Sequence, residues 1–112
     1  MSEVKHVIKI INAAIKENPA LVKGIKAVYQ FHLKDDDPDT YQFVLRGENS
    51  YIAKGVEEKA DCTLHMKADN FIKLAKGTLN GTTAFLSGKL KIEGNMGMAL
   101  KLEGILSRIK VP

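Results

Sequence analysis

Residues 26–34 read KAVYQFHLK and residues 41–46 read YQFVLR. In both runs apolar positions alternate with mostly polar ones, and this period of two predicts β-strands with one apolar and one wet face. The apolar faces hold Ala27, Tyr29, Phe31 and Leu33 in the first run and Tyr41, Phe43 and Leu45 in the second. A sheet with one apolar face needs a covering layer, so these two runs decide the fold class.

Three shorter stretches complete the expected sheet. Residues 51–53 follow a turn at 47–50, residues 60–67 alternate in the same way, and residues 89–93 form a last brief strand. The inward positions of the later strands are Ala60, Cys62, Leu64, Met66, Leu90 and Ile92. Because connections such as 35–39 are short, the strands they join are expected to run antiparallel.

The N-terminal residues 3–17 repeat apolar side chains at helical spacing, and the dipeptide Asn18-Pro19 ends the run. The opposite face of this helix holds Lys5, Lys9 and Lys16 together with Asn12. One interpretation of the three lysines is a solvated surface. The other is a membrane contact, because each lysine gains about 1 kcal/mol near anionic lipid headgroups.

Three further helices are expected in the second half of the chain. Asp69 is a suitable N-cap for a helix over residues 70–76, and Gly77 occupies the position after it. The other two helices are expected over residues 81–87 and 95–109. Together with the strands they predict an α+β fold, without a linker or an internal repeat.

The composition is that of one globular domain over residues 1–112. Apolar residues make up 45% and charged residues 27%, and the formal net charge is +4. No apolar run approaches the roughly 18 residues of a membrane span, and neither end carries a signal-peptide or retention pattern. The single cysteine, Cys62, excludes an internal disulfide, so a cytoplasmic location is expected.

No catalytic or metal-binding pattern is evident, so no enzymatic activity, cofactor or metal is expected. His6, His32 and His65 lie on different elements, without a partner at triad or ligand spacing. Cys62 points to the apolar face, where burial raises the pKa of a thiol and makes it inert. The acidic turn at 35–39 lacks the glycine and the later glutamate of a calcium loop. The strand aromatics face the core, so no nucleic acid is expected as a partner.

Two further polar features are interpreted as structural. Glu57, Glu58 and Asp61 suggest paired carboxylates, yet they cluster in a connection between strands, which favours a solvated turn. Ser87 precedes Gly88 but lacks the glycine two positions before it that a nucleophile elbow requires. Neither feature predicts catalysis.

The final helix carries more apolar surface than packing on a sheet requires. Its main stripe holds Met98, Ala99, Leu102, Ile105, Leu106 and Ile109. Met96 and Leu100 fall on a separate flank, which they share with Glu103 and Ser107. This flank packs under the preceding loop, touches a second subunit, or lines a cavity. Methionine suits a cavity, because its flexible side chain re-packs around varied ligands.

Residues 84–102 read AFLSGKLKIEGNMGMALKL, and this stretch resembles the sterol carrier protein-2 (sterol-binding) domain family. Residues 59–64, KADCTL, and residues 69–71, DNF, before Gly77 match the same family pattern. The resemblance covers essentially the whole chain. Leu86 stands where the family has a second phenylalanine, and the peroxisomal tail of many eukaryotic members is missing.

The resemblance implies a five-stranded, mostly antiparallel sheet with helices covering one face and an apolar tunnel between them. Members of the family bind fatty acids, fatty acyl-CoA, sterols or other lipids in that tunnel, so a lipid ligand is the expected partner. By position, the residues expected to line the tunnel are Phe71, Leu79, Phe85, Leu86, Met96, Leu100 and Ile105. In some relatives a glutamine occupies the position of Leu100, and leucine here suggests a drier end of the tunnel.

The expected function is therefore the non-enzymatic binding and transfer of lipids. Two alternatives stay open: an accessory domain that presents lipid to a partner enzyme, and a structural or dimerising module with a filled core. The size of the cavity separates the last from the others, because ligand sites typically enclose about 300 Å³ or more.

Overall fold

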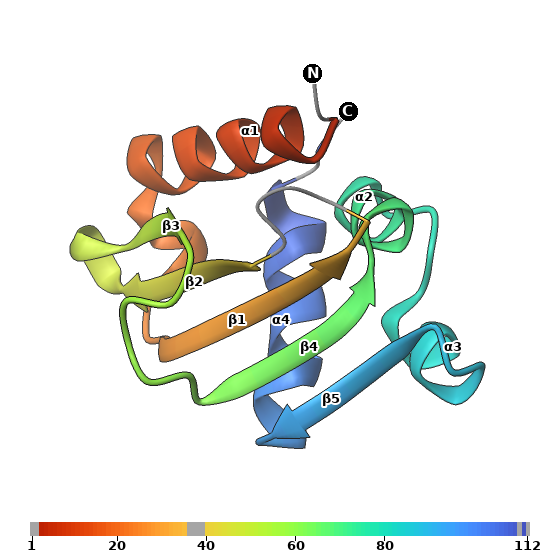
Figure 1. The fold of residues 1–112 in the computed structure, drawn as a ribbon. Coiled ribbons are helices and arrows are strands. Elements are labelled where there is room, and N and C mark those ends of the chain that lie inside the picture. The colour runs from red at the N-terminus through yellow and green to blue at the C-terminus, as the bar shows by residue number, and fades with distance from the viewer. Residues whose placement is uncertain (1–2, 36–39, 110, 112) are drawn as a thin grey trace.

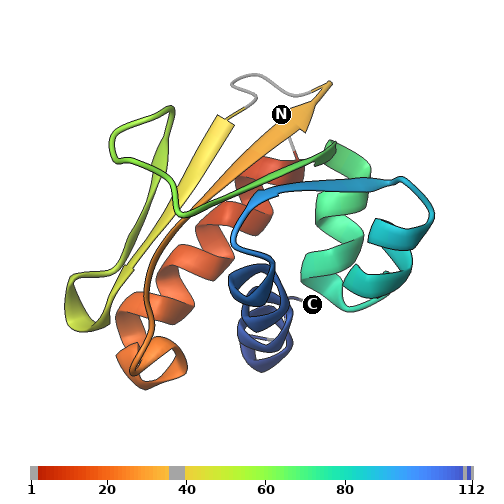
Figure 2. The ribbon, with the colours of Figure 1, turned by 90° about the horizontal axis from the view of Figure 1, so that it is seen from below.

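A sheet and a layer of helices pack face to face in a computed structural model, which describes residues 3–35, 40–109 and 111 (Figures 1 and 2). The strands are β1 (Lys26–Lys34), β2 (Thr40–Arg46), β3 (Tyr51–Lys54), β4 (Cys62–Lys67) and β5 (Leu90–Gly94). The α-helices are α1 (Glu3–Glu17), α2 (Ala68–Lys76), α3 (Gly81–Leu86) and α4 (Met96–Ile109), and the 3-10 turns are η1 (Pro19–Val22) and η2 (Gly47–Asn49). Figure 2 shows all four α-helices on one side of the sheet, which confirms the predicted α+β fold.

The strand order across the sheet is β3-β2-β1-β4-β5. β1 runs antiparallel to β2, with Tyr29 opposite Phe43, and the β2–β3 and β4–β5 pairs are antiparallel as well. β1 and β4 are parallel, with Phe31 opposite Leu64, so the sheet is mixed. The parallel pair arises because residues 55–61 carry the chain past β2 and place β4 on the other side of β1. The prediction of five mostly antiparallel strands is confirmed.

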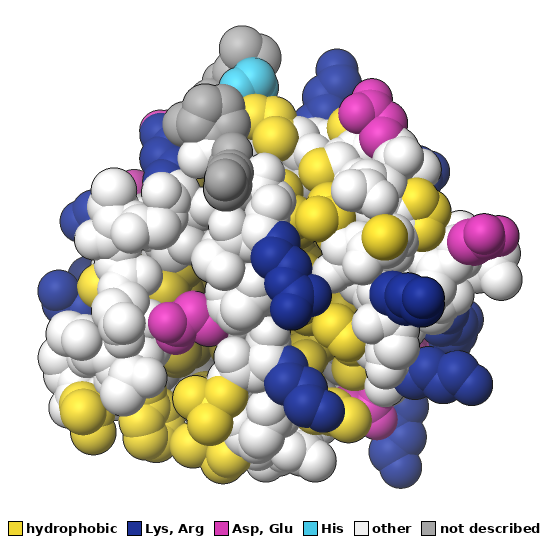
Figure 3. Space-filling view, turned by 180° about the vertical axis from the view of Figure 1, so that it is seen from behind, with side chains coloured by type: hydrophobic (Ala, Val, Ile, Leu, Met, Phe, Trp, Pro, Cys, Tyr) yellow, Lys and Arg dark blue, Asp and Glu magenta, His cyan; other side chains and the backbone are white. Residues whose placement is uncertain are grey.

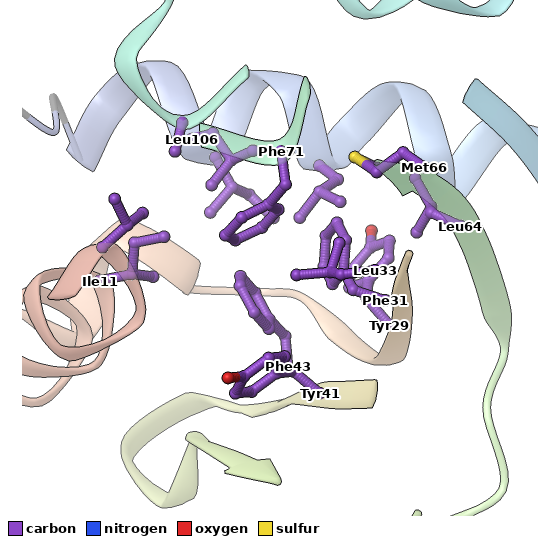
Figure 4. Close-up of a cluster of buried hydrophobic side chains, with 14 of the residues drawn as sticks. Ile11, Tyr29, Phe31, Leu33, Tyr41, Phe43, Leu64, Met66, Phe71 and Leu106 are labelled. Carbon is purple, nitrogen blue, oxygen red and sulfur yellow. The ribbon is translucent and has the colours of Figure 1, made fainter. Parts of the chain in front are cut away.

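Aromatic rings form the centre of the core between the sheet and the helices (Figure 4). The ring centroids of Phe31 and Phe43, on neighbouring strands, are 4.7 Å apart. Phe71 of α2 stands edge-on to both, with its centroid 5.2 Å from that of Phe31 and 6.4 Å from that of Phe43. Tyr29 and Tyr41 are also fully buried. The apolar face predicted for β1 and β2 is therefore the core, and Phe71 joins α2 to it.

α1 covers the predicted residues 3–17 and buries its apolar stripe, while Lys5, Lys9 and Lys16 are exposed. Its buried residues are Val4, Val7, Ile11 and Ile15. Asn12 differs from the prediction, which placed it on the face of the lysines. Its Oδ1 accepts a hydrogen bond from the backbone N–H of Ile52 at 3.4 Å, so it satisfies a donor on the edge strand β3.

α2 begins two residues before its predicted start. Lys67 is the N-cap and Ala68 the first helical residue, so Asp69 lies inside the first turn and does not cap the helix. A carboxylate there is still favourable, because the N-terminal end of a helix carries a partial positive charge. At the other end Gly77 has the predicted left-handed conformation, with φ of 79°, and its N–H binds the Leu74 carbonyl.

The alternation indicated that the face of the sheet away from the helices is solvated along its whole length. The structure shows that part of this face is buried. Gln42 and Val44 are fully buried there, and residues 57 and 58 of the connection between β3 and β4 contact Gln42. The Gln42 amide donates to the Glu58 carbonyl at 2.8 Å and to Gln30 Oε1 at 2.9 Å, and it accepts from two backbone N–H groups of the same connection. Every polar atom of this buried amide is satisfied, so it fixes the segment that leads into β4.

Candidate functional site

Two hydrogen bonds fix the start of α4 on the sheet. Tyr29 Oη donates to the Met98 carbonyl at 2.7 Å. Asn95 Oδ1 accepts from the Met98 N–H at 3.1 Å, as the side chain of an N-cap does. The residues buried along the helix are Ala99, Leu102, Ile105 and Leu106. Met98 and Ile109 are half-buried against the same core, so the predicted main stripe of α4 faces the sheet.

Asp61 is the junction at which β1, β4 and β5 meet. Its Oδ2 accepts from the Val28 N–H at 2.8 Å, and its own N–H donates to the Val28 carbonyl at 2.9 Å. Its carbonyl accepts from the Asn95 N–H at 3.3 Å and leaves no room for a side chain at Gly94, which has φ of 98°. Asp61 is exposed, as predicted, but it positions the turn into α4. Glu58 has a structural contact of its own, an ion pair with Arg46.

α3 is a six-residue helix held to α4 by one carboxylate. Asn80 Oδ1 accepts from the Thr83 N–H at 3.1 Å and caps the helix, and Ala84 is its buried residue. Glu103 Oε2, from α4, accepts from the Gly81 N–H at 3.1 Å. A Cβ at position 81 would overlap this oxygen, so glycine is needed for the contact. The side of α4 that carries Glu103 therefore faces the start of α3.

α3 and the first turns of α4 expose four large apolar side chains, and we call them the apolar rim: Phe85, Leu86, Met96 and Leu100. The exposed fraction is 78% for Leu86 and 66% for Leu100, with Met96 and Phe85 at 45% and 40%. Within the described residues, Val56 is the one other large apolar side chain that is exposed. Figure 3 shows hydrophobic side chains gathered along the lower edge, where α3 and the start of α4 lie. All four rim residues were predicted to line the tunnel.

The other three predicted lining residues lie deeper. Phe71 has no exposed surface and Ile105 is 3% exposed, and both belong to the continuous core. Leu79, between α2 and α3, is half-buried and packs against that core. The structure thus brings the rim residues to one edge and places Phe71 and Ile105 inside. The role of all seven residues in binding stays a prediction.

Cys62, His32 and His65 are the potentially reactive side chains of the sheet, and none of the three is exposed. Cys62 is buried, and this burial, followed by the charge of Asp61, raises the pKa of its thiol, as predicted. His32 and His65 lie side by side on β1 and β4, with ring centroids 5.5 Å apart, and are half-buried rather than fully solvated. His65 Nε2 lies 3.3 Å from Glu93 Oε1 without forming a well-directed hydrogen bond.

The described part of the chain holds no group of three metal-ligating side chains, and none of its helices is long and apolar enough to cross a bilayer. Of the predicted acidic turn at 35–39, only Asp35 lies within the described residues, with φ of 68°.

A pocket of about 490 Å³ adjoins the end of α3, and its lining includes Ser87 and Gly88. Five lysines surround it, and we call it the lysine pocket: Lys34, Lys67, Lys73, Lys89 and Lys91. Asp69 is the only acidic residue among the described residues that line it. Sequence spacing does not reveal this cluster, because β1, β4, α2 and β5 bring the lysines together only in the folded chain.

Residues 8–107 match the family model described as the SCP-2 sterol transfer family. The chain belongs to this family. It is 36% identical over 107 residues to hydroxysteroid dehydrogenase-like protein 2 of Bos taurus. The aligned region covers 95% of this chain and 25% of that protein. The Xenopus laevis protein of the same name is 37% identical over 109 residues, or 96% of this chain and 26% of that protein. The SCP-2 domain thus spans about a quarter of the length of these relatives.

Solved structures show the same SCP-2 fold. The sterol carrier protein domain 2 of Helicoverpa armigera superposes with a TM-score of 0.76 at 25% identity, over 95% of this chain and 86% of that one. Sterol carrier protein 2 of Yarrowia lipolytica gives 0.75 at 27% identity, over 95% and 91%. The Aedes aegypti sterol carrier protein-2 in complex with palmitate shares the fold, with a TM-score of 0.73 at 18% identity over 96% and 97%. The resemblance noted in the sequence is confirmed.

Proposed function

We propose that this SCP-2 domain binds one long-chain lipid beside α3 and α4 and transfers it between membranes without altering it covalently. The apolar rim carries the proposal, because four of the five exposed large apolar side chains in the described residues lie on α3 and the first turns of α4, where Figure 3 shows a hydrophobic edge. Single exposed apolar residues are ordinary on protein surfaces, whereas a contiguous apolar patch is typical of a binding surface.

In this proposal the rim is the entrance and the core behind it holds the lipid chain. The lipid enters between α3 and α4 and reaches Phe71 and Ile105, which now close the interior. α3 is suited to yield, because a helix of six residues is marginal on its own and this one buries only Ala84. The contact of Glu103 with Gly81 closes the entrance.

Energetics favour a carrier that exchanges its ligand. Burying a C16 chain, the length of the palmitate in the Aedes aegypti complex, yields at most about 12 kcal/mol at roughly 0.8 kcal/mol per methylene. Association and ordering of the chain remove several kcal/mol of that. The remainder gives micromolar or tighter binding with exchange at membranes.

The ligand classes that fit are fatty acids, fatty acyl-CoA and sterol-like lipids. The exposed rim is apolar throughout, so it contacts the chain of the lipid and reads no polar group, which makes discrimination between chain-like lipids weak. The structure of the Aedes aegypti relative with palmitate supports a fatty acid. We place this function in the cytoplasm, because the buried free thiol of Cys62 suits a reducing compartment.

Displacement of a fluorescent fatty acid tests the proposal. We expect saturable binding with one site per chain, and native mass spectrometry of protein purified from its host should reveal a lipid that solvent extraction releases. If fatty acids, acyl-CoAs and sterols all fail to displace the probe, the chain is instead a structural or dimerising module with a filled core.

A second candidate function follows from the relatives. In hydroxysteroid dehydrogenase-like protein 2 the matching region occupies about a quarter of a longer polypeptide. The domain would then present lipid to a neighbouring or separate enzyme. Co-purification of this chain with a lipid enzyme, whose turnover rises when the loaded domain is added, favours this role over free transport.

The exposed lysines of α1 are part of the proposal as a source of attraction to membranes. Lys5, Lys9 and Lys16 are solvated in the folded chain and add positive potential on that face. Replacing all three by glutamine should reduce the salt dependence of transfer to anionic vesicles and leave ligand affinity almost unchanged.

A further inference from the structure

We infer that the lysine pocket and the exposed end of α3 form a docking surface for anionic phospholipid membranes, with lysines on the headgroups and Leu86 among the lipid chains. The inference deepens the proposed function, because a carrier of lipids must meet the bilayer somewhere. The charge and the exposed side chains around α3 support it independently of the ligand.

Among the described residues, the lysines of the pocket form no ion pair. Of the described residues that line the pocket, five are lysines and one, Asp69, is acidic, and all five lysines are exposed. In the described residues the ion pairs are Arg46–Glu58, His65–Glu93 and Lys76–Glu3, and none of them uses a lysine of the pocket. Cations gathered in one hollow repel each other and raise the local potential, which favours a surface with several negative charges.

An apolar side chain adjoins this charge. Ser87 and Gly88 line the pocket and directly follow Leu86, the most exposed large apolar residue of the described chain at 78%. Lysines beside an exposed apolar side chain are typical of segments that lie in the membrane interface, because one group meets headgroups while the other enters the acyl region. A soluble phosphate would satisfy the lysines and leave Leu86 in water.

α1 has lysines but nothing comparable to insert. Its apolar stripe is buried against the core, so its exposed face is polar. Figure 2 shows α1 and α3 at opposite ends of the helical layer, with α4 between them, so a flat membrane meets one end at a time. The rim begins on α3, so docking there brings the entrance to the bilayer. The α1 lysines then contribute long-range attraction and not the docking contact.

Tryptophan fluorescence provides the test, because the chain contains no tryptophan. Leu86→Trp places one indole at the end of α3, and Ala13→Trp places one on the exposed side of α1 as a matched control. With vesicles of phosphatidylcholine and phosphatidylserine, we expect a blue shift and quenching by brominated acyl chains for Leu86→Trp only. With phosphatidylcholine alone, neither variant should shift.

A second experiment tests the role of the lysines. It combines Lys67→Gln, Lys89→Gln and Lys91→Gln in the Leu86→Trp background. We expect the affinity for anionic vesicles to fall by about tenfold or more, since each lysine lost removes part of the surface attraction. The same triple change in the wild-type chain should leave displacement of a fluorescent fatty acid unchanged without vesicles. This second readout separates docking from ligand binding. If the wild-type chain does not bind the fluorescent fatty acid, the proposed function is contradicted, whereas the vesicle experiment still tests the docking surface.

Three results overturn the docking surface. One is an emission of Leu86→Trp that anionic vesicles do not change. Another is an equal shift of Ala13→Trp, which assigns docking to α1 or to no defined face. The third is a saturable response of the pocket residues to pyrophosphate in NMR spectra without any response to vesicles, which assigns the lysines to a soluble phosphate ligand.

Discussion

Glu103 Oε2 accepts a hydrogen bond from the backbone N–H of Gly81 at 3.1 Å, and this contact joins the two helices that carry the apolar rim. Glu103 lies on the same flank of α4 as Leu100, and Gly81 begins the short helix that bears Phe85 and Leu86. A side chain at position 81 would displace the carboxylate. The pair therefore sets how closely α3 approaches α4, which is the width of the proposed entrance.

Removing this carboxylate should loosen α3 without unfolding the domain. For Glu103→Ala we expect a loss of about 1 kcal/mol of stability, typical of one hydrogen bond, and a rise of about fivefold in amide exchange over residues 81–86. Glu103→Gln keeps an acceptor oxygen and serves as the control. Ligand should also dissociate faster from Glu103→Ala. Equal exchange in all three proteins would mean that the contact does not hold α3.

Substitutions of Leu100 and Leu102 distinguish lipid binding from core packing on α4. Leu102 is 3% exposed, so Leu102→Ala should lower stability by roughly 2–5 kcal/mol. Leu100 is 66% exposed, so Leu100→Ala should change stability by less than about 0.5 kcal/mol and yet weaken lipid binding. Leu100→Trp should block the site and leave the fold intact.

A denaturant midpoint and a ligand affinity for each of these variants provide the check. If Leu100→Ala destabilises as much as Leu102→Ala, and Leu100→Trp unfolds the domain, then the flank is ordinary core. The entrance would then lie elsewhere.

Alkaline pH should weaken the bond between the sheet and α4. Burial, with the nearby Cys62 and Asp61, raises the pKa of Tyr29 from 10.0 to about 12. Between these values the unfolded chain loses the proton and the folded chain keeps it, so this contribution to stability is complete below pH 10 and lost as the pH rises towards 12, on the order of 2 kcal/mol in total.

Tyr29→Phe isolates the effect. At neutral pH the variant should be less stable by about 1 kcal/mol, because the Met98 carbonyl loses its donor. Since phenylalanine does not ionise, the gap between the two proteins should close above pH 10 and reverse as the pH approaches 12. Urea unfolding at a series of pH values measures it, and a gap that stays constant would show that the phenol of Tyr29 ionises alike in both states.

The thiol of Cys62 should be unreactive in the folded protein. It is buried, and its pKa is raised above the usual 9.0, so little thiolate is present or accessible near neutral pH. Ellman's reagent should modify it only after unfolding, at a rate that follows the opening of the domain. Rapid modification of the native chain would place Cys62 at the surface.

Sequence pattern predicted the elements whose signals are local. The alternation over 26–34 and 41–46 and the helical repeat over 3–17 gave β1, β2 and α1, because these residues bury one face whatever their partners are. Pairing between segments that are distant in the sequence was harder to predict. The parallel β1–β4 pair, the burial of Gln42 and the junction at Asp61 all depend on the path of residues 55–61, which carry no periodic signal.

The same limit applies to the site. The rotation of about 100° per residue in a helix predicted that Leu100 lies apart from the apolar stripe of Leu102. In the structure Leu100 is exposed and Leu102 is buried. The lysine pocket could not be predicted, because its residues come from positions as distant as Lys34 and Lys91. Lys67 occupies the N-cap position of α2 without a side-chain capping bond, because β4 passes directly into the helix and leaves no loop for a capping residue such as Asp69.

A titration of the isotope-labelled chain with palmitate, followed by amide chemical shifts, tests whether one fatty acid binds beside α3 and α4. We expect the shifts to saturate at one equivalent of fatty acid and to be largest over residues 81–86 and 96–105, the two helical segments that meet at Glu103 and Gly81. Shifts that fail to saturate, or that saturate while these two segments stay unchanged, would contradict it.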